Sequence, residues 1–338
     1  GQAQTLIAIG APPVAMSQIP AYNEWVAAPE VPDGVRDLGL RVQPNMELLS
    51  QLDIDVITIT SMYAGLRERV APIAPVETID IYDGNGAVWD RTVESTRRLG
   101  ALVGREAAAE ALVNDTQARI EACTAQVPEH VKPLLVVQFI DARHVRVYTE
   151  DSLIGSVLER MGILNAWQAG GTYWGFATVP LERLASIDNA RMVVVKPLPV
   201  GVAEEIDTSV LWHHLPAVNN APVLYVRPVW GFGGLPSASR FAREVGAKSP
   251  YDLVAGVCFM GSGLAAAALL EGHVYQVFNP WMPLMGLYLW RCAKPEAKVT
   301  DGALAALFFS LSLFTSGYIG LSAGLLGLGL GLPALAKA

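Results

Sequence analysis

A helical stretch without glycine or proline lies about a third of the way along the chain. It runs from about Glu106 to Gln126, is rich in alanine, the best helix former, and ends before Pro128. About twenty residues at a rise of roughly 1.5 Å each span about 30 Å, the width of a small domain. We therefore expect either a rigid strut that joins two lobes or an ordinary surface helix packed on one sheet.

Short apolar segments alternate with longer helical stretches on both sides of this helix. This pattern is typical of an α/β fold with mostly parallel sheets. The length of 338 residues exceeds what one hydrophobic core normally holds, so two globular units are expected. The predicted strands are Val56 to Thr60, Thr78 to Ile81, Leu134 to Ile140, Val145 to Tyr148, Met192 to Val195 and Val223 to Val226.

Charge and motifs exclude several classes of function. The net charge is −8 and the body of the chain has no basic run, which argues against a nucleic-acid surface. The three cysteines, Cys123, Cys258 and Cys292, are far apart and encode neither a disulfide framework nor a zinc site. The chain has no Gly-x-Ser-x-Gly, Walker-type or His-Glu-x-x-His motif, so we predict a protein that is not an enzyme and has no metal site of its own.

Arg41 stands on a short loop between Gly39 and Pro44, with apolar neighbours. A guanidinium carries five donors in a rigid fork and keeps its charge, so in this position it suits oxyanions or carbonyl-type oxygens. The alternative is a half-exposed arginine paired with Asp37 or Glu47.

Aromatic residues flanked by glycines occur in two segments of the second half, residues 170–175 and 228–234. Glycine-rich bends leave side chains projecting from loops, and such aromatics are typical of a binding wall for an amphipathic small molecule. Together with Trp25 they indicate a ligand site, whereas buried structural tryptophans are the alternative.

Several segments, taken in chain order, resemble one known family. They are Ile19 to Val26, Asp37 to Leu49, Ile140 to Tyr148, Asn165 to Gln168, Tyr173 to Gly175 and Pro228 to Trp230. These segments are similar to those of the periplasmic siderophore-binding proteins of ABC importers, in the ferric-hydroxamate branch of the cobalamin/iron type. The resemblance covers about residues 5 to 246, and the family's first strand and leader are expected to be missing before Gly1.

The resemblance implies a class III periplasmic binding protein, in which two Rossmann-like α/β lobes are bridged by one long helix and the ligand lies in a shallow cleft between them. The expected parts are an N-terminal lobe at 1–104, a bridging helix at 105–127, a C-terminal lobe at 128–247 and a hydrophobic tail at 248–338. The implied location is the periplasm.

The resemblance also implies the ligand contacts. Arg41 and Tyr63 are expected to donate hydrogen bonds to the hydroxamate oxygens. Trp174 and Trp230 would form aromatic walls, with Trp25 at the rim.

Two further ligand contacts follow from the same resemblance. Leu153 would add an apolar contact, and Phe232 stands where some relatives carry a tyrosine, which removes one polar contact.

The chemistry of such a ligand fits the missing metal motifs. Three bidentate hydroxamates fill the octahedral shell of iron(III), so the protein supplies no metal ligand and no cofactor, and it binds the finished iron(III)–siderophore complex from outside. A tris-hydroxamate core is close to neutral and one arginine suffices, whereas a tris-catecholate would call for more cations. The rivals are a cobalamin or haem receptor, with Tyr63 as axial ligand, a membrane protein with a docking lobe, or an enzyme that releases the ligand.

The family docks each lobe on the ABC permease through a surface carboxylate. By position these carboxylates resemble Glu68 and Glu182. Each has arginine neighbours, so a solvated helix face is the alternative.

The tail differs in composition from the body. Residues 252–338 carry four Lys/Arg and four Asp/Glu among long apolar runs, and the run from Ala303 to about Ala323 is long enough to span a membrane. A basic cluster at 291–298 favours two spans that place it in the cytoplasm. Two interpretations stay open, namely a membrane hairpin that anchors the protein at the inner membrane, and a frameshift or fusion segment without a role.

Overall fold

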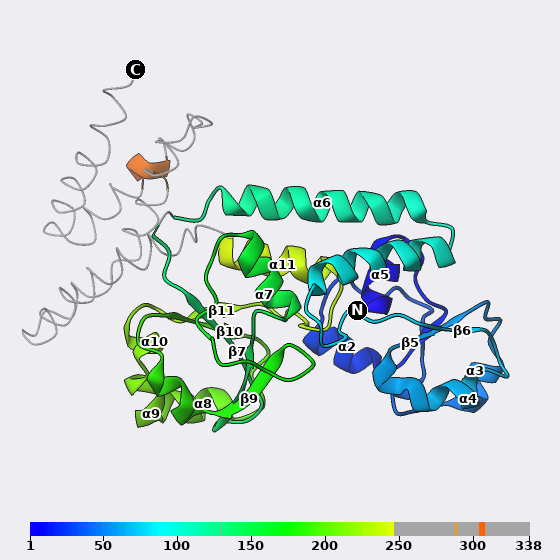
Figure 1. The fold of residues 1–338 in the computed structure, drawn as a ribbon, viewed down its shortest axis with the longest axis horizontal. Helices are drawn as coiled ribbons and strands as arrows, with labels where there is room; N and C mark the ends of the chain where they lie inside the picture. The colour runs from blue at the N-terminus through cyan, green and yellow to red at the C-terminus, as the bar shows by residue number, and fades with distance from the viewer. Residues whose placement is uncertain (129, 247–287, 289–303, 308–338) are drawn as a thin grey trace, which may run out of the picture. The chain divides into compact units, whose positions relative to one another are not determined.

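The alanine-rich stretch forms α6 (Glu106–Thr124), which ends two residues before the predicted end at Gln126. Its buried residues Ala109, Val113, Thr116, Ile120 and Cys123 recur every three or four positions, so one stripe of the helix faces the protein. In the computed structural model this stripe packs on α5 (Val88–Leu102), which precedes it, and on α7 (Leu153–Arg160) and α11 (Leu235–Gly246), which follow it (Figure 1). The predicted long helix is confirmed, and it contacts elements from both halves of the chain.

The C-terminal half is built on a five-stranded mixed sheet. The strand order is β11 (Leu224–Val226), β10 (Arg191–Val195), β7 (Leu134–Phe139), β8 (His144–Tyr148) and β9 (Phe176–Pro180). β7, β10 and β11 are parallel, whereas β8 runs antiparallel to both of its neighbours. All residues of β7 are buried, as expected for a central strand covered on both faces.

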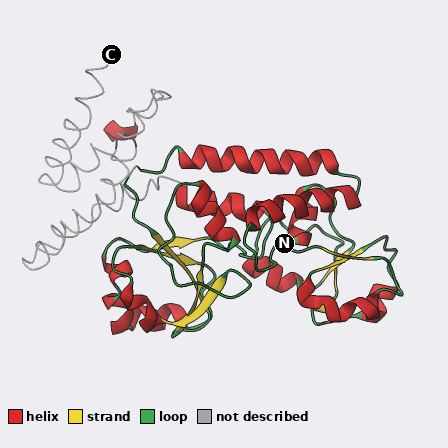
Figure 2. Ribbon diagram, in the orientation of Figure 1, coloured by secondary structure: helices red, strands yellow, loops and turns green. Residues whose placement is uncertain are grey.

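Helices cover both faces of this sheet (Figure 2). One face packs with α7 and α11, and the other packs with η2 (Leu181–Ser186), α8 (Val202–Thr208), α9 (Val210–His214) and α10 (Pro216–Asn219). The predicted strands of this half are confirmed, but β9 was not predicted.

The N-terminal half has shorter strands in three two-stranded sheets. β1 (Ala15–Met16) pairs with β2 (Arg36–Asp37) and β5 (Ile57–Ile59) pairs with β6 (Val76–Thr78), both in parallel, while β3 (Gly39–Leu40) and β4 (Gln43–Pro44) form an antiparallel hairpin. The helical elements are α1 (Gln2–Ala8), α2 (Ile19–Trp25), α3 (Met46–Ser50), η1 (Ser61–Leu66) and α4 (Arg67–Val70). The predicted mixed α/β class is confirmed, whereas the lobe boundaries stay a prediction.

A buried arginine on α11 ties the two halves together. Arg240 is 8% exposed, and its guanidinium donates to the carbonyl oxygens of Val26 at 2.5 Å, Ala28 at 2.8 Å and Pro228 at 2.8 Å. We call these four residues the carbonyl clamp. Gln4 reinforces it, since its side-chain amide also donates to the carbonyl of Ala28 at 2.8 Å. The segment after α2 and the segment after β11 are therefore held by one side chain.

The structure describes residues 1–128, 130–246, 288 and 304–307. The chain divides into two compact units, 1–247 and 248–338. Within the described ranges, no helix combines the length and apolar character that a membrane crossing requires. The predicted membrane hairpin lies almost wholly outside the described residues.

Candidate functional site

Five aromatic side chains from distant parts of the sequence pack together, and we call them the aromatic wall. They are Tyr82, Trp174, Phe176, Trp230 and Phe232. Phe232 lies at the centre, since its ring centroid is 5.3 Å from that of Trp230, 5.5 Å from Tyr82, 5.9 Å from Phe176 and 6.2 Å from Trp174. All these pairs are edge-on, a favourable geometry for aromatic rings.

The main chain between Trp230 and Phe232 is fixed by two tyrosines. A β-carbon added at Gly231 would lie 2.5 Å from the ring of Tyr148, so only glycine fits there without movement. The hydroxyl of Tyr82 donates to the carbonyl of Gly231 at 2.7 Å. Burial raises the pKa of Tyr82, which keeps this hydroxyl a donor at neutral pH.

The loop that carries Trp174 is also held across the halves. The Tyr173 hydroxyl donates to the main-chain carbonyl of Tyr82 at 2.9 Å, and its ring lies edge-on to Trp174 at 4.8 Å. Gly175 has φ +70° and lies close to the main chain of Asp151, a position that a side chain could not occupy without strain.

Arg41 lies in the turn between β3 and β4, and its Cζ atom is 5.9 Å from the ring centroid of Trp230. The alternative in which it pairs with Asp37 or Glu47 is not observed, since within the described part of the chain Arg41 forms no ion pair. The Asp37 carboxylate instead accepts from the main-chain N–H groups of Gln18 and Gly39. Arg41 is therefore a partly exposed cation beside an aromatic ring.

Arg146 is a second arginine beside the aromatic wall and was not predicted. This residue of β8 stacks on Phe176 with its Cζ atom 4.5 Å from the ring centroid, and it lies 5.9 Å from that of Phe232. A charged residue between the buried Val145 and Val147 was the available signal in the sequence. The role of such a residue depends on which strands pair with its own, and the sequence does not identify those strands.

Three aromatic residues of this region were missed: Tyr82 and Phe176, which belong to the aromatic wall, and Tyr173, which pairs with Trp174. Tyr82 directly follows the predicted strand Thr78 to Ile81, and carboxyl ends of parallel strands are favoured places for ligand contacts. Tyr173 lies in the glycine-rich segment beside Trp174, and only Trp174 was predicted to contact the ligand.

The remaining predicted ligand contacts, Tyr63, Trp25 and Leu153, are not members of the aromatic wall. Tyr63 in η1 and Trp25 at the end of α2 are partly exposed, and among the described residues neither makes a ring pair with the wall. Leu153 differs from the prediction, because it is 1% exposed inside the core and offers no surface to a ligand. Its main-chain N–H donates to the Tyr82 hydroxyl at 3.1 Å, so it supports the wall from behind.

The predicted docking carboxylates are both exposed. Glu68 lies in the first turn of α4 and Glu182 in the first turn of η2, one in each half.

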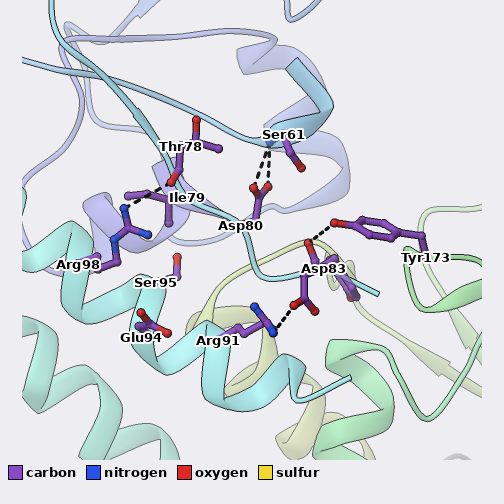
Figure 3. Close-up of a pocket in the computed structure, with 11 residues that line it drawn as sticks. Ser61, Thr78, Ile79, Asp80, Asp83, Arg91, Glu94, Ser95, Arg98 and Tyr173 are labelled. Atoms are coloured by element: carbon purple, nitrogen blue, oxygen red, sulfur yellow. Dashed lines mark hydrogen bonds and ion pairs between the residues drawn. The ribbon is translucent and has the colours of Figure 1, made fainter. Parts of the chain in front are cut away.

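A polar pocket of about 280 Å³ (Figure 3) shares Tyr82 with the aromatic wall. Several of its polar groups already have partners: Arg91 pairs with Asp83, and the Asp80 carboxylate accepts the main-chain N–H of Ser61 at 3.0 Å. The pKa of Asp83 is lowered, chiefly by the main-chain N–H of Asn85. None of the predicted ligand contacts lines this pocket, which is lined by Ser61, Thr78, Ile79, Asp80, Tyr82, Asp83, Arg91, Glu94, Ser95, Arg98 and Tyr173.

The part of the chain that the structure describes holds no group of three or more His, Cys, Asp or Glu side chains close enough to bind a metal ion. What the site offers is aromatic surface and guanidinium donors, which suit an amphipathic ligand that carries oxygen acceptors.

Comparison with known proteins gives a consistent result. A family model described as periplasmic binding protein matches residues 1–229. The iron(3+)-hydroxamate-binding protein FhuD of Escherichia coli (strain K12) is 29% identical over 241 residues, which cover 71% of this chain and 81% of that protein. The Fe(3+)-citrate-binding protein YfmC of Bacillus subtilis (strain 168) is 25% identical over 211 residues, covering 62% of this chain and 65% of that one.

Solved structures show the same likeness. The siderophore-binding protein FhuD from Vibrio cholerae, bound to Fe3+-Desferal, has a TM-score of 0.68 at 27% identity and covers 72% of this chain and 92% of its own. The triscatecholate siderophore-binding protein FeuA from Bacillus subtilis has a TM-score of 0.59 at 15% identity, with 72% and 87% covered, and this likeness concerns the fold.

Proposed function

Because the chain belongs to the periplasmic binding protein family, a family of non-enzymatic receptors, we propose that it captures an iron(III)–hydroxamate siderophore and delivers it to an ABC permease. Its mixed α/β fold matches that of the class III periplasmic siderophore-binding proteins, and such proteins act outside the cytoplasm. Similarity to iron-hydroxamate, iron-citrate and other siderophore binders supports an iron complex as the ligand.

The observation that carries the proposal is an arginine without an ion-pair partner in the described part of the chain, beside an aromatic wall. Arg41 lies 5.9 Å from the ring of Trp230, and Phe232 connects Trp230 to Trp174. Aromatic faces suit the aliphatic linkers of a hydroxamate siderophore, while the guanidinium donates to an iron-bound oxygen without touching the metal. In this proposal Tyr63 is the second donor and Trp25 lies at the rim.

Tryptophan fluorescence of the full chain tests this function. We expect quenching by a neutral tris-hydroxamate such as ferrichrome, and weaker or no quenching by a ferric tris-catecholate, haem or cobalamin. Arg41→Met should weaken hydroxamate binding roughly tenfold, because it removes a charge-assisted hydrogen bond.

Arg119→Met is the matched control, since Arg119 is an exposed arginine on α6 and its loss should leave affinity unchanged. Absence of any hydroxamate response in the unmodified chain would refute the proposed function, and preference for haem or cobalamin would favour the rival receptors.

We propose Glu68 and Glu182 as the contacts to the permease. They are exposed near the starts of short helical elements in the two halves, which supports a surface role. Charges at the rim of an interface govern association rate and orientation more than affinity. Reversal of both, Glu68→Lys with Glu182→Lys, should abolish uptake through the permease while siderophore affinity stays unchanged; normal uptake by the double variant would contradict this role.

Anchoring at the inner membrane by residues 248–338 is a separate proposal that rests on the sequence alone. It predicts that the full chain sediments with membranes and that a chain ending at residue 247 does not. Equal behaviour of the two chains would rule it out.

A further inference from the structure

Arg146 projects from the sheet toward the aromatic wall. In β8 its neighbours Val145 and Val147 are buried in the core cluster on one face of the sheet, and strand alternation places Arg146 on the opposite face. Phe176 packs against the core cluster of that opposite face. The Cζ atom of Arg146 lies 4.5 Å from the ring centroid of Phe176. Arg146 is partly exposed and stands at the edge of the wall.

Arg146, Gln138 and Tyr148 form a polar group that has more hydrogen-bond donors than acceptors in use. Arg146 Nη1 donates to Gln138 Oε1 at 3.0 Å, and the Tyr148 hydroxyl donates to the same oxygen at 3.0 Å. Burial raises the pKa of Tyr148, so its hydroxyl stays protonated and serves as a donor. Gln138 Oε1 thus accepts two hydrogen bonds.

Two nitrogen atoms of this group are buried and unpaired. Arg146 Nε and Gln138 Nε2 have no hydrogen-bond partner, and Gln138 is 1% exposed. Buried donors are nearly always satisfied in native proteins, because an unsatisfied one has lost its hydrogen bonds to water without replacement. The group therefore lacks acceptors, and within the described ranges no carboxylate forms an ion pair with Arg146.

Two guanidinium groups without carboxylate partners in the described ranges consequently lie beside one aromatic wall. Arg41 lies 5.9 Å from Trp230 and Arg146 lies 5.9 Å from Phe232, while the two rings are 5.3 Å apart. Ring faces attract cations but do not neutralise them. A neutral ligand would leave both positive charges uncompensated, whereas an anionic ligand would complement them.

We infer that the preferred ligand is an anionic iron(III) chelate in which hydroxamates are combined with a carboxylate-bearing group, and that Arg146 is the residue that selects it. This inference rests on the proposed function and narrows its ligand class. The sequence indicated one pocket arginine and hence a neutral tris-hydroxamate; the second guanidinium changes that conclusion.

The test compares two iron(III) complexes on the full chain by fluorescence titration. The anionic probe is the iron(III) complex of a citrate-based dihydroxamate, and the neutral probe is ferrichrome. We expect about tenfold tighter binding of the anionic probe, as one added charge-assisted contact provides. Raising the salt concentration should weaken only the anionic complex.

Variants separate selection from a structural role. Arg146→Met removes the charge but keeps a long side chain on Phe176, so it should bring the anionic probe to the affinity of the neutral one. Arg146→Lys retains the charge and should restore most of the preference. The matched control is Arg160→Met, which removes another stacked arginine, 4.3 Å from the ring of Trp89, and should change neither affinity.

The possible outcomes distinguish failure of the ligand inference from failure of the proposed function. Equal affinity of the unmodified chain for both probes, or equal weakening of both by Arg146→Met, overturns the inference and leaves the proposed function in place. Failure of the unmodified chain to bind either probe overturns the proposed function itself.

Discussion

Phe232 is the residue on which the geometry of the wall depends most, since four aromatic rings meet its own. The sequence prediction treated it as a missing tyrosine hydroxyl. In the structure its ring lies between Trp230 and Trp174 and also faces the guanidinium of Arg146. Its contribution is therefore the packing of the wall.

Gly231 sets the position of Phe232 and gives a prediction at this scale. Gly231→Ala should lower the free energy of unfolding by roughly 1–3 kcal/mol, because the new methyl group overpacks against the ring of Tyr148. Urea denaturation measures the loss, and siderophore affinity should fall with it because the wall must shift.

The control is Gly65→Ala, at a position where an added β-carbon meets nothing within 4 Å. It should change stability by less than about 0.5 kcal/mol. Similar losses in both variants would show that Gly231 is not a tight position.

Single residues also show which parts of the candidate site can be predicted from the sequence. Arg41, Trp174, Trp230 and Phe232 were predicted from the family resemblance of the loops that carry them, and the structure brings them to one place. Arg146 was not, because its role depends on the pairing of β7 with β8 and on a phenylalanine thirty residues further along.

At the scale of elements, local composition was sufficient for α6 and for the buried strands. β7 is apolar at most positions and α6 is rich in alanine, and both signals are confined to a few neighbouring residues. β9 was missed because Phe176–Pro180 has only partly buried or exposed residues and ends in proline, a pattern typical of edge strands. Its place is set by pairing with β8 along its whole length.

The carbonyl clamp predicts a coupling between elements. Arg240→Met should lower the free energy of unfolding by roughly 3 kcal/mol, since the carbonyls of Val26, Ala28 and Pro228 lose a charged donor. Amide exchange in residues 24–30 should become faster, as measured by mass spectrometry.

Arg243→Met provides the comparison, because Arg243 is an exposed residue on the same helix. It should alter neither quantity. If the two variants exchange alike, the clamp does not hold the segment after α2.

On the scale of the whole molecule, the α/β class was predictable because strand and helix signals alternate along the chain. The three small sheets of the N-terminal half were less so, since strands of two or three residues leave almost no periodic signal. The contacts between the two halves could be predicted neither from the alternation of strand and helix signals nor from periodicity within an element. They join residues far apart in the sequence, such as Tyr82 and Gly231, which are 149 positions apart, and no local pattern encodes such a pair.

Buried tyrosines predict the response of the whole fold to alkaline pH. Burial raises the pKa of Tyr22 to about 12 and raises that of Tyr82 and Tyr148 as well, from the ordinary value of 10.0. Above about pH 10 the unfolded chain releases these protons while the folded chain keeps them, so the free energy of unfolding falls as pH rises. Urea denaturation between pH 8 and about pH 11 should show a plateau followed by this decline.

Tyr82→Phe should make the alkaline decline shallower by at most about 1.4 kcal/mol per pH unit, the limit for one titrating group. The slope is the informative quantity, because loss of the hydrogen bonds of Tyr82 also lowers stability at every pH. An unchanged slope would mean that Tyr82 does not remain protonated in the folded state.

The carbonyl clamp has a consequence for how the ligand preference of such a receptor can change in evolution. All three acceptors of Arg240 are main-chain oxygens, which every amino acid possesses. The side chains of the same segments, Trp25 and Trp230 among them, take no part in the clamp. Substitutions at the rim and wall can therefore accumulate without loosening the frame that carries them, so new ligand preferences can arise through single steps while the fold stays the same.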